Sequence, residues 1–237
     1  VSGTCEYDYF MIINPDIYFK PNALRDVIQN MNKNEHVGLS SVKILNPDSS
    51  IQYVHRTFAS LWNVIMRCLY AILKSMKLLR KLHIESLFNK LMSKHEMRDK
   101  YEHGTFKAQM ISGCFMCFRA SIFRKLGGFD ERFFMYFEDT DLCKRMWIKN
   151  WKVVYHPKFN LLHHVGGSSS QNVYISVFNF HKSIYLYCYK YTNPRLFSII
   201  KFFIIPLLIT RASIILTIHL FKRMIGNLFR KLVHISP

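Results

Sequence analysis

The stretch SGCFMCFRASIFRKLGGFDERFFMYFEDTDLCKRM, from Ser112 to Met146, contains in one run the signals that decide the fold. Its apolar beginning is typical of a strand, and the residues from about Arg119 to Leu126 form a short helical pattern that Gly127-Gly128 would end. An aromatic loop then leads to a second predicted helix, from about Asp139 to Lys149. Strands that alternate with helices in this way are typical of the α/β class.

The sequence around this stretch continues the alternation. The apolar run DYFMII, from Asp8 to Ile13, is expected to form a strand that is buried on both faces of a parallel sheet and that ends at Pro15. A second strand with a proline stop is predicted for WKVVYHP, from Trp151 to Pro157. The other predicted elements are a helix at residues 21–31, strands at 37–45 and 50–58, and basic helical sequence at 61–97.

The charge of the chain suggests an anionic partner. Among its 237 residues, Lys and Arg outnumber Asp and Glu by 33 to 15, and 50% of the residues are hydrophobic. Much of the positive charge is interleaved with apolar residues, at 67–92 and again at 196–232, whereas nucleic-acid binders more often carry basic clusters in polar surroundings. We therefore expect no nucleic-acid partner and favour an anionic membrane surface, with ordinary core helices that expose a basic face as the alternative.

The segment from Phe202 to Leu220 is the most apolar part of the chain and is just long enough to cross a bilayer. Pro206 would kink a helix there. Arg211, near the middle, makes a crossing costly, by about 2.5–3.5 kcal/mol on insertion scales. The sequence therefore favours a helix that lies in the membrane interface over one that spans the membrane.

The chain has 6 cysteines, and only Cys114 and Cys117 form a Cys-x-x-Cys pair. A zinc site would need two further ligands at suitable spacing. The apolar surroundings of the pair favour buried free thiols instead, and a reducing, cytoplasmic setting fits them.

The tripeptide Asn-Pro-Asp occurs twice, each time after an apolar run. The copy that contains Asn14 and Asp16 follows a predicted buried strand, and in open α/β sheets ligands bind at the carboxyl ends of the strands. A carboxylate such as Asp16 can hold a divalent cation there, and the cation can hold a diphosphate. The second copy, at residues 46–48, is followed by two serines and another strand, so it is predicted to be a β-turn.

Three carboxylates gather in the stretch MYFEDTDLCKR: Glu138, Asp139 and Asp141. At the start of a helix such residues interact favourably with the helix dipole and can cap the helix. Asp141 can also form an i,i+4 pair with Arg145, which would give structural support to the helix. The aromatic approach FFMYF would in addition place the cluster in a partly dry pocket, where a carboxylate is a reasonable general base.

Three histidines follow these carboxylates in the stretch HPKFNLLHHVGGSS: His156, His163 and His164. A single histidine is more often structural than a ligand. One that follows a carboxylate-bearing helix and a strand is nevertheless a candidate to complete a metal site.

The stretch INPDIYF, the stretch from Ser112 to Met146 and the stretch WKVVYHPKFNLLHHVGGSS together resemble the family 2 glycosyltransferases. The closest resemblance is to the rhamnosyltransferase-like group that builds bacterial O-antigen and capsule glycans. It covers roughly residues 6–60 and 105–170. It implies a GT-A fold and inverting transfer from a nucleotide-sugar donor, with dTDP-L-rhamnose as the leading candidate. The implied acceptor is a polyprenyl-diphosphate-linked glycan.

The resemblance also implies a role for each motif. Asn14 and Asp16 stand where the family has its Asp-x-Asp, so they would bind the donor diphosphate, with Asp16 as the carboxylate on Mg²⁺ or Mn²⁺. In the pair Glu138-Asp139 the aspartate would be the catalytic base, and His163 would reach the metal. The residues implied on the acceptor side are Ser112, Gly113, Cys114 and Tyr136.

The family begins with a strand, a helix and a strand that bind the nucleotide, and this sequence is expected to lack them, which would leave the GT-A domain incomplete at its N-terminus. We expect that domain at residues 1–190, with a variable basic helical insertion at 61–97, followed by a membrane-associating helical tail at 191–237. Such a protein would act peripherally at the cytoplasmic face of the bacterial inner membrane. The alternative is a truncated, non-catalytic remnant or a membrane-associated assembly subunit.

Overall fold

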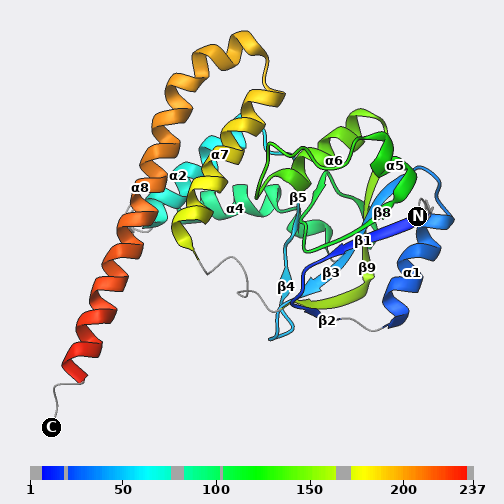
Figure 1. Cartoon of the computed structure of the whole chain (residues 1–237), viewed down its shortest axis with the longest axis horizontal. Coiled ribbons are helices and arrows are strands. Elements are labelled where there is room, and N and C mark those ends of the chain that lie inside the picture. The colour runs from blue at the N-terminus through cyan, green and yellow to red at the C-terminus, as the bar shows by residue number, and fades with distance from the viewer. Residues whose placement is uncertain (1–6, 19–20, 76–82, 102–103, 164–171, 234–237) are drawn as a thin grey trace, which may run out of the picture. The chain divides into compact units, whose positions relative to one another are not determined.

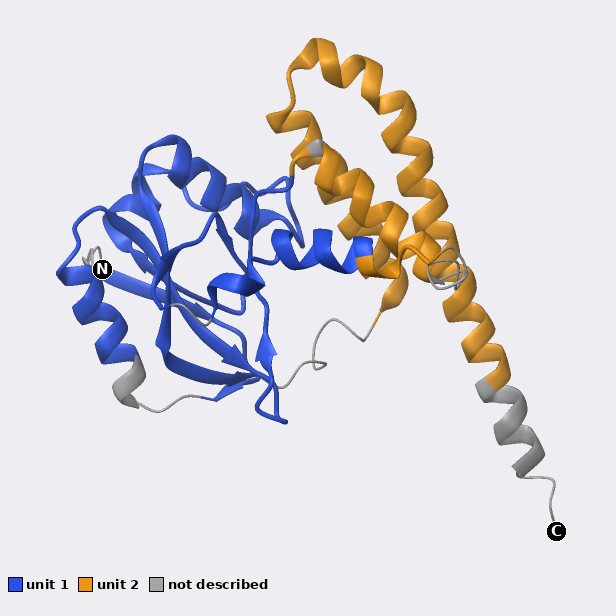
Figure 2. Ribbon diagram, turned by 180° about the vertical axis from the view of Figure 1, so that it is seen from behind, with its two compact units in different colours: residues 1–59, 87–168 blue, residues 60–86, 169–237 orange. Residues whose placement is uncertain are grey.

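The computed structural model describes residues 7–18, 21–75, 83–101, 104–163 and 172–233 (Figure 1). The chain divides into two compact units, residues 1–59 with 87–168 and residues 60–86 with 169–237 (Figure 2). This division differs from the expected boundary at residue 190. Helices α2 (Leu61–Ser75) and α7 (Val173–Tyr191) belong to the second unit, because both pack against the C-terminal helix.

A mixed sheet forms the centre of the first unit, which is therefore of the α/β class, as predicted. Its strands are β1 (Tyr9–Ile13), β2 (Ile17–Tyr18), β3 (Val37–Leu45), β4 (Ile51–Gln52), β6 (Phe106–Lys107), β8 (Phe115–Arg119) and β9 (Lys152–His163). The main path runs in the order β1-β8-β3-β9-β2, while β4 pairs with β3 and β6 pairs with β9. The pair β3–β9 is parallel, and the other pairs are antiparallel. A separate ribbon joins β5 (His55–Arg56) to β7 (Met110–Ile111).

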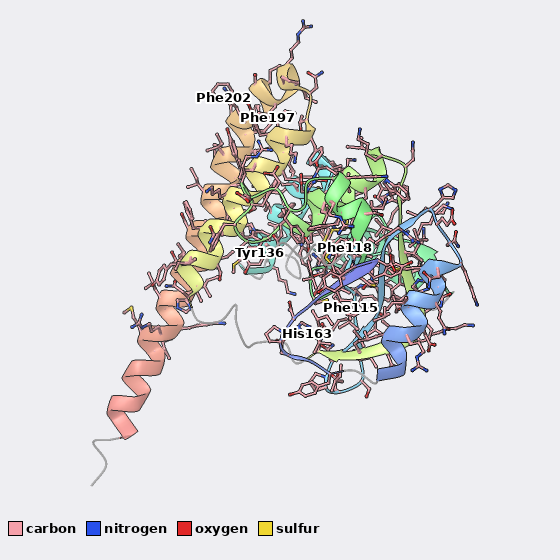
Figure 3. The ribbon with its side chains drawn as sticks, turned by 45° about the vertical axis from the view of Figure 1, so that its right-hand side comes forward. Phe115, Phe118, Tyr136, His163, Phe197 and Phe202 are labelled. Carbon is pink, nitrogen blue, oxygen red and sulfur yellow. The ribbon has the colours of Figure 1, made fainter. Side chains whose placement is uncertain are left out.

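Helices cover both faces of this sheet. The helix α1 (Pro21–Asn32) contributes Val27 to the buried cluster on one face, and α6 (Glu138–Ile148) contributes Leu142 to the cluster on the other. Strand β8 alternates between the two clusters, since Phe115 belongs to the α1 cluster and Phe118 to the α6 cluster (Figure 3). The remaining helices of this unit are α4 (Glu85–His95), the short 3₁₀ helix η1 (Arg98–Lys100) and α5 (Ala120–Lys125).

Strand β1 lies in a different setting from the predicted one. It runs antiparallel to β8 rather than within a parallel sheet, and each of its 5 residues is only half-buried. Its odd-numbered residues pack against the α1 cluster and its even-numbered residues against the α6 cluster, which explains why the run is continuously apolar. The strand is not fully buried, because β8 is its only neighbour among the described strands.

Two other predicted elements are divided in the structure. The predicted strand at 50–58 forms the two short strands β4 and β5, because β4 pairs with β3 whereas β5 pairs with β7 of the separate ribbon. The predicted helical sequence at 61–97 contains α2 and the whole of α4, while its residues 76–82 lie outside the described part of the chain.

Helices α2, α7 and α8 (Pro194–Val233) make up the described part of the second unit. Phe197 of α8 is buried against the rings of Tyr185 and Tyr189 of α7, at centroid distances of 5.5 Å each. Phe202 lies one and a half turns further along α8 and is exposed (Figure 3). Pro206 lies inside α8 and does not end it.

The helix α8 is long and apolar enough to cross a membrane between Pro194 and Ile225, and its most apolar 18-residue window has a mean hydropathy of 2.2. The predicted cost of Arg211 in such a helix assumes a charge that has no protein partner. Its guanidinium instead lies 3.0 Å from His181 Nε2 and stacks on Phe180 at 4.8 Å, and both partners belong to α7. Arg211 therefore argues less strongly against a crossing than the sequence indicates.

The 5 cysteines in the described part of the chain are buried, free thiols, while Cys5 lies outside it. Burial raises the pKa of Cys114 and of Cys117 to about 12. Both belong to the buried α1 cluster, which is the structural role that their apolar surroundings predict.

Candidate active site

The first Asn-Pro-Asp copy forms the turn between β1 and β2. The amide of Ile17 donates a hydrogen bond to the carbonyl of Asn14 at 3.2 Å, and the amide of Asn14 donates to the carbonyl of Cys114 at 3.0 Å. Strand β2 then pairs with the end of β9, with Ile17 opposite His163. This pairing brings Asp16, the residue just before β2, next to His163.

Strand β9 reaches His163 because Pro157 does not end it, contrary to the prediction. The register of β9 against β3 shifts between His156 and Asn160. Such a bulge accommodates proline, whose nitrogen cannot donate a hydrogen bond to the neighbouring strand. The strand thus continues for 12 residues, from Lys152 to His163.

Asp16, Asn14 and His163 form a polar cluster (the metal-side cluster), with His163 labelled in Figure 3. His163 Nε2 lies 3.2 Å from Asp16 Oδ1 and 3.4 Å from Asn14 Nδ2. Asp16 Oδ1 is buried and has no hydrogen-bond partner among the described residues. A buried carboxylate oxygen and an imidazole nitrogen at this separation fit a divalent cation. Since the described residues contain no group of three or more His, Cys, Asp or Glu side chains, the other ligands would come from substrate and water.

The second Asn-Pro-Asp copy forms the predicted turn, between β3 and β4. The amide of Ser49 donates to the carbonyl of Asn46 at 2.9 Å, and Asp48 Oδ1 accepts from the amide of Ser50 at 3.0 Å and from its hydroxyl at 2.6 Å. These hydrogen bonds lower the pKa of Asp48. The copy is more than a turn, however, because the side-chain oxygen of Asn46 accepts a hydrogen bond from Gln52 Nε2 at 2.7 Å.

Gln52 also contacts His163, and no feature of the sequence indicated this. Its Oε1 lies 2.9 Å from His163 Nδ1, and its Nε2 donates to the carbonyl of His163 at 3.0 Å. Gln52 lies opposite Ile44 in the β3–β4 pair, a position that follows from the hairpin and not from any motif. The only signal in the sequence is its place in the strand that directly follows the second Asn-Pro-Asp turn.

Glu138 and Asp139 begin α6 after an unusual turn. Tyr136 and Phe137 have left-handed φ values of 66° and 67°. Bulky side chains rarely adopt this conformation, which costs on the order of 1–3 kcal/mol per residue and is concentrated at functional sites. Phe137 occupies the N-cap position, so none of the three carboxylates is the N-cap residue of α6.

Asp139 is held by two neighbours. Its Oδ2 accepts a hydrogen bond from the amide of Gly113 at 2.9 Å, and its Oδ1 accepts from the hydroxyl of Thr140 at 3.1 Å. Burial raises the pKa of Asp139, while these hydrogen bonds and the positive charge of Arg56 oppose the rise. A fixed, partly dry carboxylate is suited to act as a general base.

Glu138 is also perturbed. Burial raises its pKa to about 7, and the negative charge of Asp139 adds to the shift. Its Oε2 is buried and has no hydrogen-bond partner among the described residues. Glu138 therefore gains or loses its proton near neutral pH.

Replacing Glu138 with Gln is expected to raise the free energy of unfolding by about 1 kcal/mol near pH 8, a value discounted for the partial exposure of this side chain. Near pH 4 the replacement should change the free energy of unfolding little. The pKa of this carboxyl is higher in the folded than in the unfolded state, so the stability of the wild type falls as the pH rises from about 4.5 to about 7. Urea unfolding at both pH values measures the difference. The same pH dependence in both proteins would contradict the expectation.

The acceptor-side candidates lie at or near this carboxylate pair. A side chain added at Gly113 would lie 3.9 Å from Asp139 Oδ2, an ordinary contact, so packing alone does not require glycine. Ser112 and Tyr136 are half-buried. Cys114 is only 5% exposed and packs in the core, so its side chain does not line an acceptor surface, contrary to the expectation.

Gly113 and Cys114 connect the two halves of the site. The amide of Gly113 donates to Asp139, and the carbonyl of Cys114, one residue later, accepts from the amide of Asn14. The carboxylate pair and the first Asn-Pro-Asp loop are therefore anchored at the same point, where the chain enters β8.

Asp141 and Arg145 form an ion pair, with 2.8 Å between Oδ2 and Nε, and Asp141 is fully buried. The other two guanidinium nitrogens of Arg145 donate to the carbonyls of Leu126 and Gly128, at 2.7 Å each. These bonds connect α6 to the segment that follows α5, which is a structural role.

Arg56 is a second residue that the sequence did not indicate. It lies opposite Met110 in the β5–β7 ribbon, and Met110 Sδ contacts the Thr140 hydroxyl at 3.5 Å. Directly opposite residues in a strand pair lie on the same face, so Arg56 faces the start of α6. Its Nε is buried without a hydrogen-bond partner among the described residues, and its charge acts on Asp139.

Comparisons with known proteins were made for the whole chain. A family model described as the N-terminal domain of galactosyltransferase matches residues 95–165. The N-acetylglucosaminyl-diphospho-decaprenol L-rhamnosyltransferase of Mycobacterium tuberculosis is 27% identical over 180 residues, which cover 76% of this chain and 54% of that protein. Rhamnosyltransferase WbbL of Escherichia coli K12 is 26% identical over 182 residues, which cover 76% of this chain and 61% of that protein. The matches thus span little more than half the length of these relatives.

Proposed function

We propose that this chain, a rhamnosyltransferase-like protein of the family 2 glycosyltransferases, transfers a sugar from a nucleotide-sugar donor with inversion at the anomeric carbon. Its similarity to two rhamnosyltransferases supports L-rhamnose as the sugar and dTDP-L-rhamnose as the donor. The name of the mycobacterial relative supports a polyprenyl-diphosphate-linked glycan as the acceptor. The mixed sheet between helices is compatible with the GT-A fold that we assign to the first unit.

The observation that carries this proposal is the common anchor of the two motifs at Gly113 and Cys114. Inverting transfer needs a base for the acceptor hydroxyl and a cation for the leaving diphosphate, on opposite sides of one sugar. Anchors one residue apart support the proposal that Asp139 and the metal-side cluster act on the same sugar.

In the proposed reaction, Asp139 takes the proton of the acceptor hydroxyl while that oxygen attacks the anomeric carbon. The bond from this carbon to the diphosphate breaks, and its electron pair leaves with the diphosphate. Gly113 and Thr140 keep Asp139 in place, and Arg56 favours its ionised form. When bound, Mg²⁺ or Mn²⁺ offsets the negative charge that develops on the leaving group.

The metal-side cluster is where the cation of this proposal would bind. Asp16 and His163 would hold it through an oxygen and a nitrogen atom, and Asn14 would lie beside the diphosphate.

The proposal is tested by a transfer assay with a panel of nucleotide sugars, including dTDP-L-rhamnose, and a polyprenyl-diphosphate-linked N-acetylglucosamine acceptor. The expected product carries one added rhamnose of inverted anomeric configuration, measured by mass spectrometry and NMR. An absence of transfer from every donor with Mn²⁺ or Mg²⁺ present would support the non-catalytic alternative.

Replacing Asp16 with Ala is expected to weaken the binding of dTDP in the presence of Mn²⁺ by about 10–100-fold, because a metal ligand is lost. Isothermal titration calorimetry measures this affinity. The matched control is Asp48→Ala, which changes the same tripeptide in the second copy and should leave the affinity unchanged. Equal losses in both variants would contradict the assignment of the first copy.

We further propose that the second unit holds the protein at the cytoplasmic face of the inner membrane. The helix α8 exposes large apolar side chains, at Leu196, Ile199, Phe202, Phe203, Ile205, Ile209, Leu220, Phe221, Met224 and Ile225. The formal net charge of +18 suits anionic lipids.

The protein is therefore expected to sediment with anionic vesicles and to be released by alkaline carbonate, as a peripheral protein is. Binding that is equally strong to neutral vesicles would contradict the electrostatic part of this proposal. Retention after carbonate treatment would show that α8 spans the bilayer.

A further inference from the structure

The side-chain amide of Gln52 makes three contacts, two with His163 and one with Asn46. Its Nε2 donates to the carbonyl of His163 and to the side-chain oxygen of Asn46, and its Oε1 faces His163 Nδ1 at 2.9 Å. The three distances lie between 2.7 and 3.0 Å, so each is a well-formed hydrogen bond. The amide of Gln52 is half-buried at the end of the β3–β4 hairpin.

These contacts determine which ring nitrogen of His163 carries the proton. A backbone carbonyl can only accept, so the atom of Gln52 that faces the carbonyl of His163 must be its NH₂ group. The oxygen of Gln52 therefore faces Nδ1, and an oxygen can only accept from an N–H group. In the neutral imidazole this places the hydrogen on Nδ1 and leaves a lone pair on Nε2.

The lone pair on Nε2 is directed at another acceptor. Asp16 Oδ1 lies 3.2 Å away and has no hydrogen-bond partner among the described residues. Two acceptors at this distance repel one another in water-poor surroundings unless a cation lies between or beside them. Asn14 Nδ2, 3.4 Å from Nε2, can donate a long hydrogen bond to this lone pair, but Asp16 Oδ1 still lacks a partner among the described residues, and a cation bound by both atoms would supply one.

We propose that Gln52 is a positioning residue, which fixes the tautomer and the ring orientation of His163 so that Nε2 binds a divalent cation together with Asp16. This inference rests on the proposed function, because the cation is the one that would hold the donor diphosphate. Gln52 does not touch the cation and acts only through His163. Partners of this kind commonly orient metal-binding histidines in proteins.

The second Asn-Pro-Asp copy gains a role from this contact. Asn46 accepts from Gln52 with one end of its amide and donates to the hydroxyl of Ser50 at 2.8 Å with the other. The turn thus supports Asn46, Asn46 supports Gln52, and Gln52 supports His163. The second copy acts on the first one through two side chains.

The test combines NMR of the His163 ring with Mn²⁺ binding in the presence of dTDP, measured by the electron paramagnetic resonance of free Mn²⁺. The wild type is expected to carry its proton on Nδ1 without metal. Gln52→Leu removes all three hydrogen bonds and should raise the dissociation constant of Mn²⁺ about 10–100-fold, with a mixture of His163 tautomers. Gln52→Glu keeps an acceptor for Nδ1 but loses both N–H bonds, so it should keep the Nδ1 tautomer and bind Mn²⁺ with an affinity between those of Gln52→Leu and the wild type.

The matched control is Asp48→Ala, which alters the same turn but keeps the hydrogen bonds among Ser50, Asn46 and Gln52, and it should bind Mn²⁺ as the wild type does. A proton on Nε2 in the metal-free wild type, or unchanged Mn²⁺ affinity in Gln52→Leu, would overturn the inference. If the wild type binds no Mn²⁺ and transfers no sugar, the proposed function fails. The tautomer still decides the inference in that case, since its dependence on Gln52 is measured without metal.

Discussion

Replacing Asp139 with Asn is expected to lower the rate of sugar transfer by about 10²–10⁴-fold, the usual contribution of a general base. An amide has the shape of the carboxyl group, and its oxygen can still accept from the amide of Gly113, but it cannot take a proton from the acceptor hydroxyl. The binding of dTDP with Mn²⁺ should stay unchanged, because Asp139 lies outside the metal-side cluster. Initial rates at saturating donor and acceptor measure the first effect, and calorimetry measures the second.

Asp139→Asn and Asp16→Ala are expected to affect different steps of the reaction. One variant should lose the chemical step and keep nucleotide binding, while the other should lose nucleotide binding itself. Thermal denaturation of Asp139→Asn shows whether the fold is retained. Normal turnover in a folded Asp139→Asn protein would exclude this residue as the base and direct attention to Glu138.

Replacing Arg145 with Met should lower the free energy of unfolding of the first unit by about 3–5 kcal/mol, which is typical when one partner of a buried ion pair is removed. The change leaves the fully buried carboxylate of Asp141 without its cation. It also leaves the carbonyls of Leu126 and Gly128 without the hydrogen bonds that the guanidinium donates. Urea unfolding followed by circular dichroism measures the loss.

The control for this variant is Arg124→Met, because Arg124 is an exposed arginine in the last turn of α5. Its loss should change the free energy of unfolding by less than about 0.5 kcal/mol, as is usual for surface positions. A similarly small effect of Arg145→Met would mean that water replaces the guanidinium and that the pair does not hold α6 to the end of α5.

Local elements could be predicted from the sequence because their signals are local. Strand β3 has the predicted bounds, from Val37 to Leu45, and α6 begins and ends within one residue of its predicted bounds. Pairing partners could not be predicted, since a continuously apolar run such as β1 looks the same whether the neighbouring strand is parallel or antiparallel. The effect of Pro157 on β9 could not be predicted either, because it depends on the pairing with β3. A proline that would end an isolated strand is tolerated where a bulge changes the register between the two strands.

The site was predicted to a similar extent. Asp16 and His163, which are far apart in the sequence, lie 3.2 Å apart. Gln52 and Arg56 belong to no motif, and their importance depends on which side chains the folded chain brings to them. Cys114 was assigned to the acceptor side from its place in a motif, but its side chain packs in the buried α1 cluster.

The common anchor at Gly113 and Cys114 has a consequence for engineering acceptor specificity. These residues hold both Asp139 and the first Asn-Pro-Asp loop, so inserting or deleting one residue there would displace both attachments at once. A graft from a relative should therefore exchange residues 112–114 together with the segments around Asn14 and Asp139, as a single module. Point substitutions at Tyr136, which lies outside this anchor, are the less disruptive way to test the proposed acceptor side.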